Sequence, residues 1–155
     1  MKEIILVRGA SGAGKTSFVK TMMALAQTDT QEIPMNVIVD EISADKYFYN
    51  DKGEYVFNPK ELSHAHAFCQ SVTCDFVQTV GEYELESGET DVKHVIFIHN
   101  TFTRDWEMKP YEDLAKSIGY TIRHIIVENR HESDSVHDVP KTSIEDQKER
   151  FEVCL

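Results

Sequence analysis

The chain has 155 residues, of which 41% are hydrophobic and 28% charged, with 16 basic residues against 27 acidic ones and a formal net charge of −11. This length favours a single domain spanning residues 1–155, and the composition is that of an ordinary soluble globular protein. No apolar run approaches the roughly 18–20 residues that span a bilayer. The acidic Glu3 and the early Gly9 exclude a signal-peptide core, so we expect a cytoplasmic protein without membrane contact.

The negative charge restricts the partners more than the fold. Proteins that grip long nucleic acids usually present a basic surface, because neutralised phosphates supply much of the affinity. Any nucleic-acid contact is therefore expected to be local, at one end or a short overhang. A small-molecule acceptor fits the charge at least as well. The oligomeric state is not indicated by the sequence.

The cysteines point away from metals and disulfides. Cys69, Cys74 and Cys154 form no CxxC pair and have no histidine at zinc-finger spacing. Cys69 and Cys74 fall within a helical pattern and are predicted to be buried free thiols.

The first part of the chain predicts a strand, a loop, a helix and a second strand. Ile4 to Val7 is short, apolar and rich in β-branched residues, as in a buried parallel strand. The helix that follows the glycine-rich loop is expected to bury Phe18, Met22 and Leu25 on one face. The second strand is predicted at 36–39.

A turn at 50–53 precedes the clearest helix signal. Asn58 is a good N-cap, Pro59 suits the first helical position, and Glu61 completes a capping-box pattern. Gly88 is expected to end this helix. Its predicted buried stripe has steps of three and four residues and consists of Ala65, Cys69, Val72, Phe76, Val80 and Tyr83.

The second half of the chain continues the alternation. A buried strand is predicted at 94–98, a loop at 100–104, and a helix that ends at Gly119. A further strand is predicted at 121–127. Strands that alternate with helices at these lengths predict a three-layer α/β fold with a mainly parallel central sheet, with ligands at the carboxyl ends of the strands.

Beyond the last predicted strand, residues 128–140 are polar and lack periodicity, and we expect them to form a lid segment. Ser143 is predicted to cap a short final helix that carries Ile144, Lys148 and Phe151.

Residues 9–16, GASGAGKT, match the P-loop pattern GxxxxGK[ST] in full, between a predicted strand and a predicted helix. The glycines let backbone N–H groups turn inward around phosphates, and the helix N-terminus adds its positive dipole. Lys15 is expected to reach the β- and γ-phosphates, and the Thr16 hydroxyl to ligate Mg²⁺. The predicted ligands are a nucleoside triphosphate, ATP, with Mg²⁺, and the binding set is Gly9, Ala10, Ser11, Gly12, Ala13, Gly14, Lys15, Thr16 and Ser17. The chain lacks an NKxD-type guanine motif and is short for a motor ATPase, so a compact P-loop kinase fits best.

Four segments resemble the 5′-hydroxyl polynucleotide kinase group of P-loop proteins, in the same order and over nearly the whole chain. They are RGASGAGKTSF, SADKYFYNDKGEYVFNPKELSHAHAFCQ, VIFIHNTFTRDWEMKPYEDLAKSIGY and HDVPKTSIEDQKERFE. The resemblance implies a P-loop NTPase fold and transfer of the γ-phosphate of ATP to a polynucleotide 5′-hydroxyl.

The resemblance also implies a general base. Asp45 matches the aspartate that takes the proton from the acceptor hydroxyl, and an attacking alcohol does need a carboxylate within hydrogen-bond reach. Asp40 and Glu41 compete for the role. The triplet that follows the strand at 94–98 is His99-Asn100-Thr101, where relatives commonly have a carboxylate in the first place and polar contacts in the others.

Two departures from the family pattern concern positive charge. Ser133 and Asp134 stand about where the lid of family kinases carries arginine, so Arg130 is the nearest candidate for the catalytic clamp on the phosphates, with His131 in support. The acceptor-side arginine, three residues past the base, is Phe48 here, which predicts a more aromatic acceptor pocket.

Two functional hypotheses follow. In the first, the chain is a kinase in which Lys15, Asp45 and Arg130 are catalytic, with Lys46 as a second candidate for steadying the transferred group. Its acceptor is a polynucleotide 5′-hydroxyl, or alternatively a nucleoside or other small molecule. In the second, the chain is an ATP-binding regulatory module with little turnover.

Overall fold

Four parallel strands form the central sheet of the computed structural model, which describes residues 1–28, 37–129 and 137–153. The strands are β1 (Lys2–Arg8), β2 (Val37–Ile42), β3 (Lys93–His99) and β4 (Thr121–Ile126), in the order β2-β3-β1-β4. Every described pairing is parallel, so all four strands end at the same edge of the sheet. The chain has the predicted three-layer α/β P-loop fold, with a described sheet that is parallel throughout.

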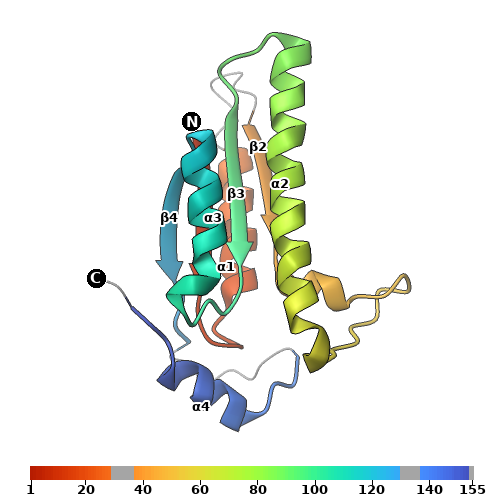
Figure 1. Cartoon of the computed structure of the whole chain (residues 1–155), viewed down its shortest axis with the longest axis vertical. Coiled ribbons are helices and arrows are strands. Elements are labelled where there is room, and N and C mark those ends of the chain that lie inside the picture. The colour runs from red at the N-terminus through yellow and green to blue at the C-terminus, as the bar shows by residue number, and fades with distance from the viewer. Residues whose placement is uncertain (29–36, 130–136, 154–155) are drawn as a thin grey trace.

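Three helices cover the two faces of this sheet (Figure 1). Helix α1 (Lys15–Thr28) lies on one face, and α2 (Leu62–Ser87) and α3 (Asp105–Ile118) lie on the other. Alternate side chains of the strands therefore enter different cores. Ile5 and Val7 pack with α1, whereas Ile4 and Leu6 pack with α2 and α3.

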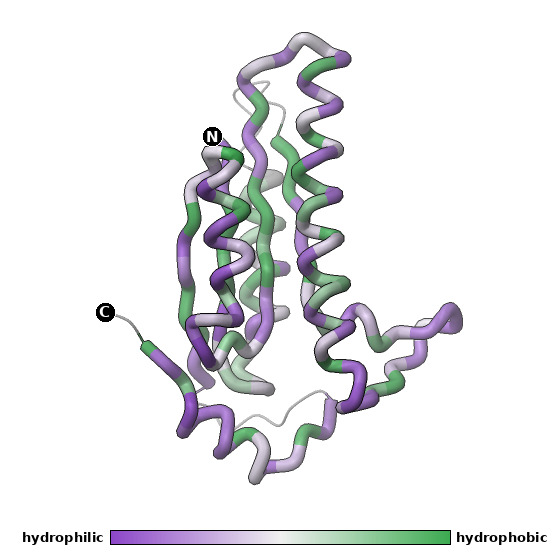
Figure 2. The backbone as a smooth tube through the Cα atoms, in the orientation of Figure 1, coloured by the Kyte–Doolittle hydropathy of each residue, from purple (hydrophilic) through white to green (hydrophobic). Residues whose placement is uncertain are grey.

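The last helix, α4 (Lys141–Glu149), lies across the carboxyl edge of the sheet and not on either face (Figure 1). It contains no buried residue and is hydrophilic along most of its length, in contrast to the central strands (Figure 2). Burial of an apolar face therefore does not hold α4 in place; its contacts with the loops at this edge do.

The helix boundaries follow the predicted signals closely. The Asn58 side chain accepts a hydrogen bond from the backbone N–H of Lys60, and Pro59 opens a 3₁₀ turn (Pro59–Glu61) that leads directly into α2. Helices α2 and α3 end at Gly88 and Gly119, as predicted. The capping box predicted at Glu61 is not formed, since the turn is 3₁₀ there.

Two residues of the predicted apolar stripes lie in solvent. Leu25 is 57% exposed, because α1 turns Val19, Met22 and Met23 toward the sheet in addition to Phe18. At the end of α2, Tyr83 is exposed because the helix, ~39 Å long at 1.5 Å per residue, extends past the strands it covers (Figure 1). The rest of the α2 stripe is buried or packs against the core.

Strand β2 is longer at its carboxyl end than predicted, and Asn36 lies outside the described residues. It includes Asp40 and Glu41, two residue types that are unfavourable in a sheet. Each is paired with a buried histidine of β3: Asp40 Oδ2 lies 2.8 Å from His94 Nε2, and Glu41 Oε2 lies 2.8 Å from His99 Nε2. These cross-strand pairs explain why polar residues continue the strand.

Two smaller predictions are settled by the fold. Cys69 is buried as predicted, but Cys74 is exposed, because it lies on the solvent side of α2. Helix α4 begins at Lys141 behind Pro140, whose carbonyl accepts from Ile144 N at 3.1 Å, so Ser143 lies inside the first turn and does not cap the helix. None of the described helices is long and apolar enough to cross a membrane.

Candidate functional site

The P-loop connects β1 to α1 at the carboxyl edge of the sheet, where three segments converge on its first glycine. Gly9 N donates to Thr101 O at 3.2 Å, and a Cβ atom at Gly9 would collide with the carbonyl oxygen of Val127. Gly9 also has a φ of +156°. Only glycine fits where the end of β4 crosses the loop so closely.

Lys15 lies inside the curve of the loop. Its Nζ donates to Gly9 O at 2.8 Å and to Ala10 O at 3.0 Å. Burial lowers the pKa of Lys15 to about 8, and the Asp45 carboxylate opposes part of that shift. Lys15 and Asp45, which are 30 residues apart in the sequence, therefore interact electrostatically at the same edge of the sheet.

The first turn of α1 presents two hydroxyl groups near the loop. Thr16 and Ser17 are exposed, and within the described residues the Thr16 hydroxyl makes no hydrogen bond. No group of three or more His, Cys, Asp or Glu side chains in the described part of the chain could hold a metal ion. Because Mg²⁺ usually keeps few protein ligands and shares phosphate oxygens, a single exposed hydroxyl fits a metal that arrives with the nucleotide.

Asp45 lies in a 3₁₀ turn (Ala44–Phe48) that directly follows β2. The turn is fixed by Asn100, whose Oδ1 accepts from Ala44 N at 2.8 Å. The side chain of Asp45 is 54% exposed, and its Oδ1 accepts from the Tyr55 hydroxyl at 3.5 Å. Its Oδ2 lies 3.8 Å from Nε2 of His137. The carboxylate is thus oriented by neighbours and still open to solvent.

The two carboxylates that competed with Asp45 for the role of base are already paired. Asp40 contacts the buried His94, and Glu41 contacts both His99 and Lys46. The hydrogen bond from His99, followed by those from Lys46, lowers the pKa of Glu41 to about 2, although burial opposes the shift. Among these three residues, Asp45 has the most exposed side chain, at 54% against 24% for Asp40 and 25% for Glu41.

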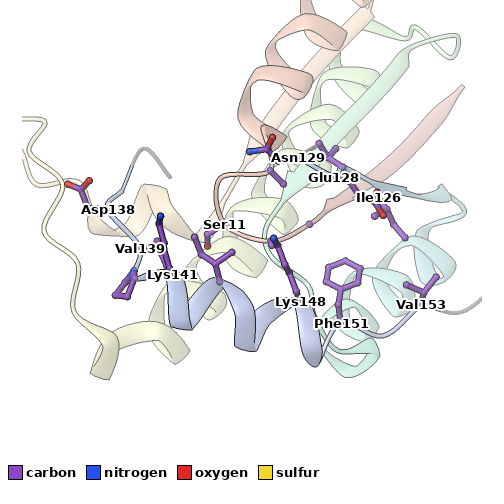
Figure 3. Close-up of a pocket in the computed structure, with 16 residues that line it drawn as sticks. Ser11, Ile126, Glu128, Asn129, Asp138, Val139, Lys141, Lys148, Phe151 and Val153 are labelled. Atoms are coloured by element: carbon purple, nitrogen blue, oxygen red, sulfur yellow. The ribbon is translucent and has the colours of Figure 1, made fainter. Parts of the chain in front are cut away.

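A cavity of about 1540 Å³ lies between the P-loop, the end of β4 and α4. Figure 3 shows Ser11 on the loop, Asn129 after β4, and Lys141, Lys148 and Phe151 on α4 and the segment after it. Its lining therefore combines the backbone of the loop with two cations, an aromatic ring and the carboxylates of Glu128 and Asp138. Lys15, Thr16 and Asp45 do not line it, so it opens on the α4 side of the loop and not toward the carboxylate.

A model of the family described as "AAA domain" matches residues 4–154, nearly the full chain. The chain belongs to this AAA domain family. It is therefore a P-loop nucleotide-binding domain, as the loop at 9–16 predicted.

The human protein named NEDD4-binding protein 2 is similar to this AAA domain. The two are 34% identical over 119 residues, which cover 77% of this chain and 5% of that protein. The chain thus spans about a twentieth of the length of this relative.

Some residues predicted to be functional have structural partners in the AAA domain. Phe48 is buried, so it is not the aromatic side chain of an open acceptor pocket. Asn100 holds the turn that carries Asp45, and the Thr101 carbonyl accepts from Gly9. Lys46 Nζ lies 2.6 Å from Glu41 Oε1 and is paired with that carboxylate.

Other residues of the AAA domain were missed by sequence reasoning. Arg8 is buried, donates to Phe102 O and Glu152 O, and lies over the Phe151 ring. From α4, Gln147 Oε1 accepts from Ser11 N at 2.8 Å. Two sequence features could have indicated the contacts of Arg8: an arginine directly after an apolar strand, and the distinctive ERFE stretch near the end of the chain.

The structure describes only the two ends of the predicted lid at 128–140. Arg130, His131, Ser133 and Asp134 lie outside the described residues. On the near side, Asn129 Nδ2 donates to Gly12 O at 3.1 Å. On the far side, the His137 ring stacks on the Tyr55 ring at 4.1 Å. The described ends of the predicted lid thus contact the P-loop and the segment beside Asp45, respectively.

Proposed function

We propose that this AAA domain is an ATP-dependent kinase that transfers the γ-phosphate of ATP to a hydroxyl acceptor, above all a polynucleotide 5′-hydroxyl. The observation that carries the proposal is that the P-loop follows β1 and the Asp45 turn follows β2 at the same carboxyl edge of the sheet, where the Asp45 carboxylate acts on the pKa of Lys15. A P-loop alone serves many reactions, whereas a solvent-open carboxylate opposite its lysine suits proton removal from an attacking alcohol. The segments that resemble polynucleotide kinases support the acceptor class.

The nucleotide side of the reaction is assigned to residues 9–17. In this proposal the loop amides bind the phosphates, and Lys15 exchanges its contacts with Gly9 O and Ala10 O for phosphate oxygens. Thr16 would hold Mg²⁺, which neutralises charge on the β- and γ-phosphates when it is bound. The cavity between the loop and α4 offers room for the nucleoside part of ATP.

The acceptor side is assigned to Asp45. Its carboxylate accepts the proton of the hydroxyl as the new O–P bond forms and the bond to the leaving ADP breaks. Burial and the neighbouring Asp45 carboxylate raise the pKa of Tyr55 to about 12, so this phenol stays protonated and can donate to Asp45. Because Tyr55 donates to Oδ1, the proposal assigns the acceptor hydroxyl to Oδ2, which lies 3.8 Å from His137 Nε2.

The remaining assignments complete the proposal. Arg130 is retained as the catalytic clamp of a lid at 128–140, and residues 1–155 as one domain. The net charge of −11 and the pairing of Lys46 with Glu41 favour a second candidate acceptor, a nucleoside or another small molecule with few phosphates.

The test compares the wild type with Asp45→Asn, using ATP, Mg²⁺ and an oligonucleotide with a 5′-hydroxyl. We expect kcat to fall about 10²- to 10⁴-fold while the Kd for ATP changes less than about threefold. Asp51→Asn, which removes an exposed carboxylate of the nearby turn, is the matched control and should leave both values unchanged.

Transfer that survives Asp45→Asn would remove Asp45 from the role of base. Tight ATP binding by the wild type without transfer to an oligonucleotide or a nucleoside would refute the kinase and favour a regulatory ATP-binding module.

A further inference from the structure

Directly after the Asp45 turn, the chain forms a short hairpin of residues 49–57, which we call the aromatic hairpin. Its arms are joined by an antiparallel bridge between Tyr49 and Tyr55. Its tip is closed by Asn50, whose Oδ1 accepts from Lys52 N at 3.0 Å and from Glu54 N at 2.9 Å. These bonds give the segment a defined shape despite its distance from the main core.

The arms of the aromatic hairpin carry rings that are open to solvent. Tyr49 is 48% exposed and Phe57 is 50% exposed. The Tyr55 and Phe57 rings are parallel to within 10°, with centroids 6.5 Å apart, and Tyr49 lies 5.2 Å from Tyr55. Phe57 is held from below by the buried Phe48, at 5.0 Å. The result is a fixed surface of ring faces and edges.

This surface begins at the proposed base. The Tyr55 hydroxyl donates to Asp45, and the His137 imidazole stacks on the Tyr55 ring with 22° between their planes. A planar nitrogen heterocycle therefore already occupies a face of the hairpin's central ring, within 3.8 Å of the Asp45 carboxylate. The hairpin thus accepts this class of ring beside the reacting group.

The charges around the aromatic hairpin do not form a track for phosphates. Residues 43–61 are nearly balanced, and Lys46 is already paired with Glu41. Sites that follow a nucleic-acid backbone need a row of cations, whereas stacking on aromatic rings does not. The charged residues of this segment are Lys46, Lys52 and Lys60 against Asp45, Asp51, Glu54 and Glu61.

We infer that the aromatic hairpin is the acceptor platform, on which the base next to the attacked hydroxyl stacks so that the hydroxyl reaches Asp45. This inference rests on the proposed function and specifies its substrate: a nucleoside or the terminal nucleotide of a single strand, held by its base. Every nucleobase has a π-face, so recognition is tolerant of sequence. Phosphates farther along a strand contribute little.

The experiment uses two 5′-hydroxyl dinucleotides, one with a base on the terminal residue and one abasic there, at saturating ATP. For the wild type, we expect kcat/KM to be about tenfold or more lower with the abasic acceptor. Phe57→Ala and Tyr49→Ala should each lower kcat/KM for the base-bearing acceptor severalfold or more and change the abasic value less than about twofold.

Three control variants and a longer acceptor separate stacking from folding and from general surface effects. Phe57→Trp keeps a ring and should retain activity, whereas Phe57→Leu keeps apolar volume and should behave like Phe57→Ala. Tyr83→Ala removes a ring at the far end of α2 and should change nothing. Extending the acceptor from two to ten nucleotides should alter kcat/KM less than about threefold.

Equal use of both dinucleotides by the wild type would overturn the platform and leave phosphotransfer intact, as would a steep gain with acceptor length. No transfer to the dinucleotides, the ten-nucleotide acceptor or a nucleoside would instead refute the proposed kinase. In that event, equilibrium dialysis of both dinucleotides against the protein with ADP and Mg²⁺ still tests the platform. Base-dependent retention that Phe57→Ala abolishes supports it, and equal or absent retention rejects it.

Discussion

The P-loop and the aromatic hairpin lie at the same edge of the sheet, and they are built in opposite ways. The loop contacts its surroundings through backbone atoms: Gly9 N binds Thr101 O, and Ser11 N binds Gln147. The hairpin presents side chains to solvent. Its own backbone is closed locally by the Asn50 side chain. In the proposed function, backbone groups, which every residue has, bind the nucleotide, whereas side chains, which differ from one sequence to another, bind the acceptor.

The largest expected effect comes from a substitution that disturbs the P-loop alone. In Gly9→Ala, the new methyl group meets the Val127 carbonyl, so either the loop or the end of β4 must shift. We expect the free energy of unfolding to fall by about 3 kcal/mol and ATP binding to be lost. Chemical denaturation and calorimetric titration with ATP measure both.

Gly81→Ala is the matched control, because an added Cβ there, inside α2, meets nothing. It should stabilise the protein by about 0.5–1 kcal/mol and leave ATP binding unchanged. If Gly9→Ala behaves like Gly81→Ala, the loop is less constrained than its contacts indicate.

The second prediction concerns the contact between Glu41 and the buried His99, at the end of β2. Glu41→Gln should lower the free energy of unfolding by about 2 kcal/mol at pH 7, because His99 loses its charged partner while buried. The pKa of Glu41 is about 2, below its ordinary 4.5, so its contribution is complete above pH 4.5 and disappears as the pH falls to about 2.

Urea unfolding at pH 7 and pH 3 therefore gives curves for wild type and Glu41→Gln that converge in acid. Glu54→Gln, in the exposed hairpin tip, is the control and should show a much smaller difference. Parallel pH profiles for wild type and Glu41→Gln are the contrary result.

The third prediction tests the nucleotide side by pH. The pKa of Lys15 is about 8 without nucleotide, because burial disfavours its charge. The ammonium form binds phosphate, so affinity is full below pH 8 and declines as the pH rises above it. We expect the Kd for ATP to increase about tenfold between pH 7 and pH 9.

Lys15→Arg supplies the comparison, since its guanidinium stays charged over this range. Its Kd for ATP should be weaker at pH 7 and nearly constant up to pH 9. A wild-type Kd that does not change with pH would contradict the assigned burial of Lys15.

The smallest expected effect comes from a substitution that disturbs the aromatic hairpin alone. Asn50→Ala removes the acceptor for two backbone N–H groups in an exposed turn, which should cost about 1 kcal/mol or less of stability. The KM for a base-bearing acceptor should rise severalfold, while the Kd for ATP stays within about twofold. Lys52→Ala, at the same tip, should alter neither, and a parallel loss of ATP affinity would show that the two regions are coupled.

Local rules explain most of what could be predicted. Periodicity located the strands and helices, and Asn58, Gly88 and Gly119 marked helix ends because capping depends on a few neighbouring residues. The P-loop was evident because its conformation is encoded in consecutive glycines.

Long-range pairing explains what could not be predicted. The predicted strand ended before Asp40 and Glu41, because the sequence does not show that the sheet places His94 and His99 beside them. Phe48 was predicted to line the acceptor pocket, but α2 covers its ring. The exposed rings lie a few residues later in the chain. No local pattern indicates that Gln147 contacts Ser11, 136 residues away.

The central position of β1 has a consequence for synthesis. Both neighbours of this first strand, β3 and β4, are translated much later, and Arg8 finds the Glu152 carbonyl only across a separation of 144 residues. The segment that forms the P-loop therefore leaves the ribosome long before the residues that shape it. Its final geometry is a late folding event, so a nascent chain should gain the capacity to retain ATP only when nearly all of these residues have emerged.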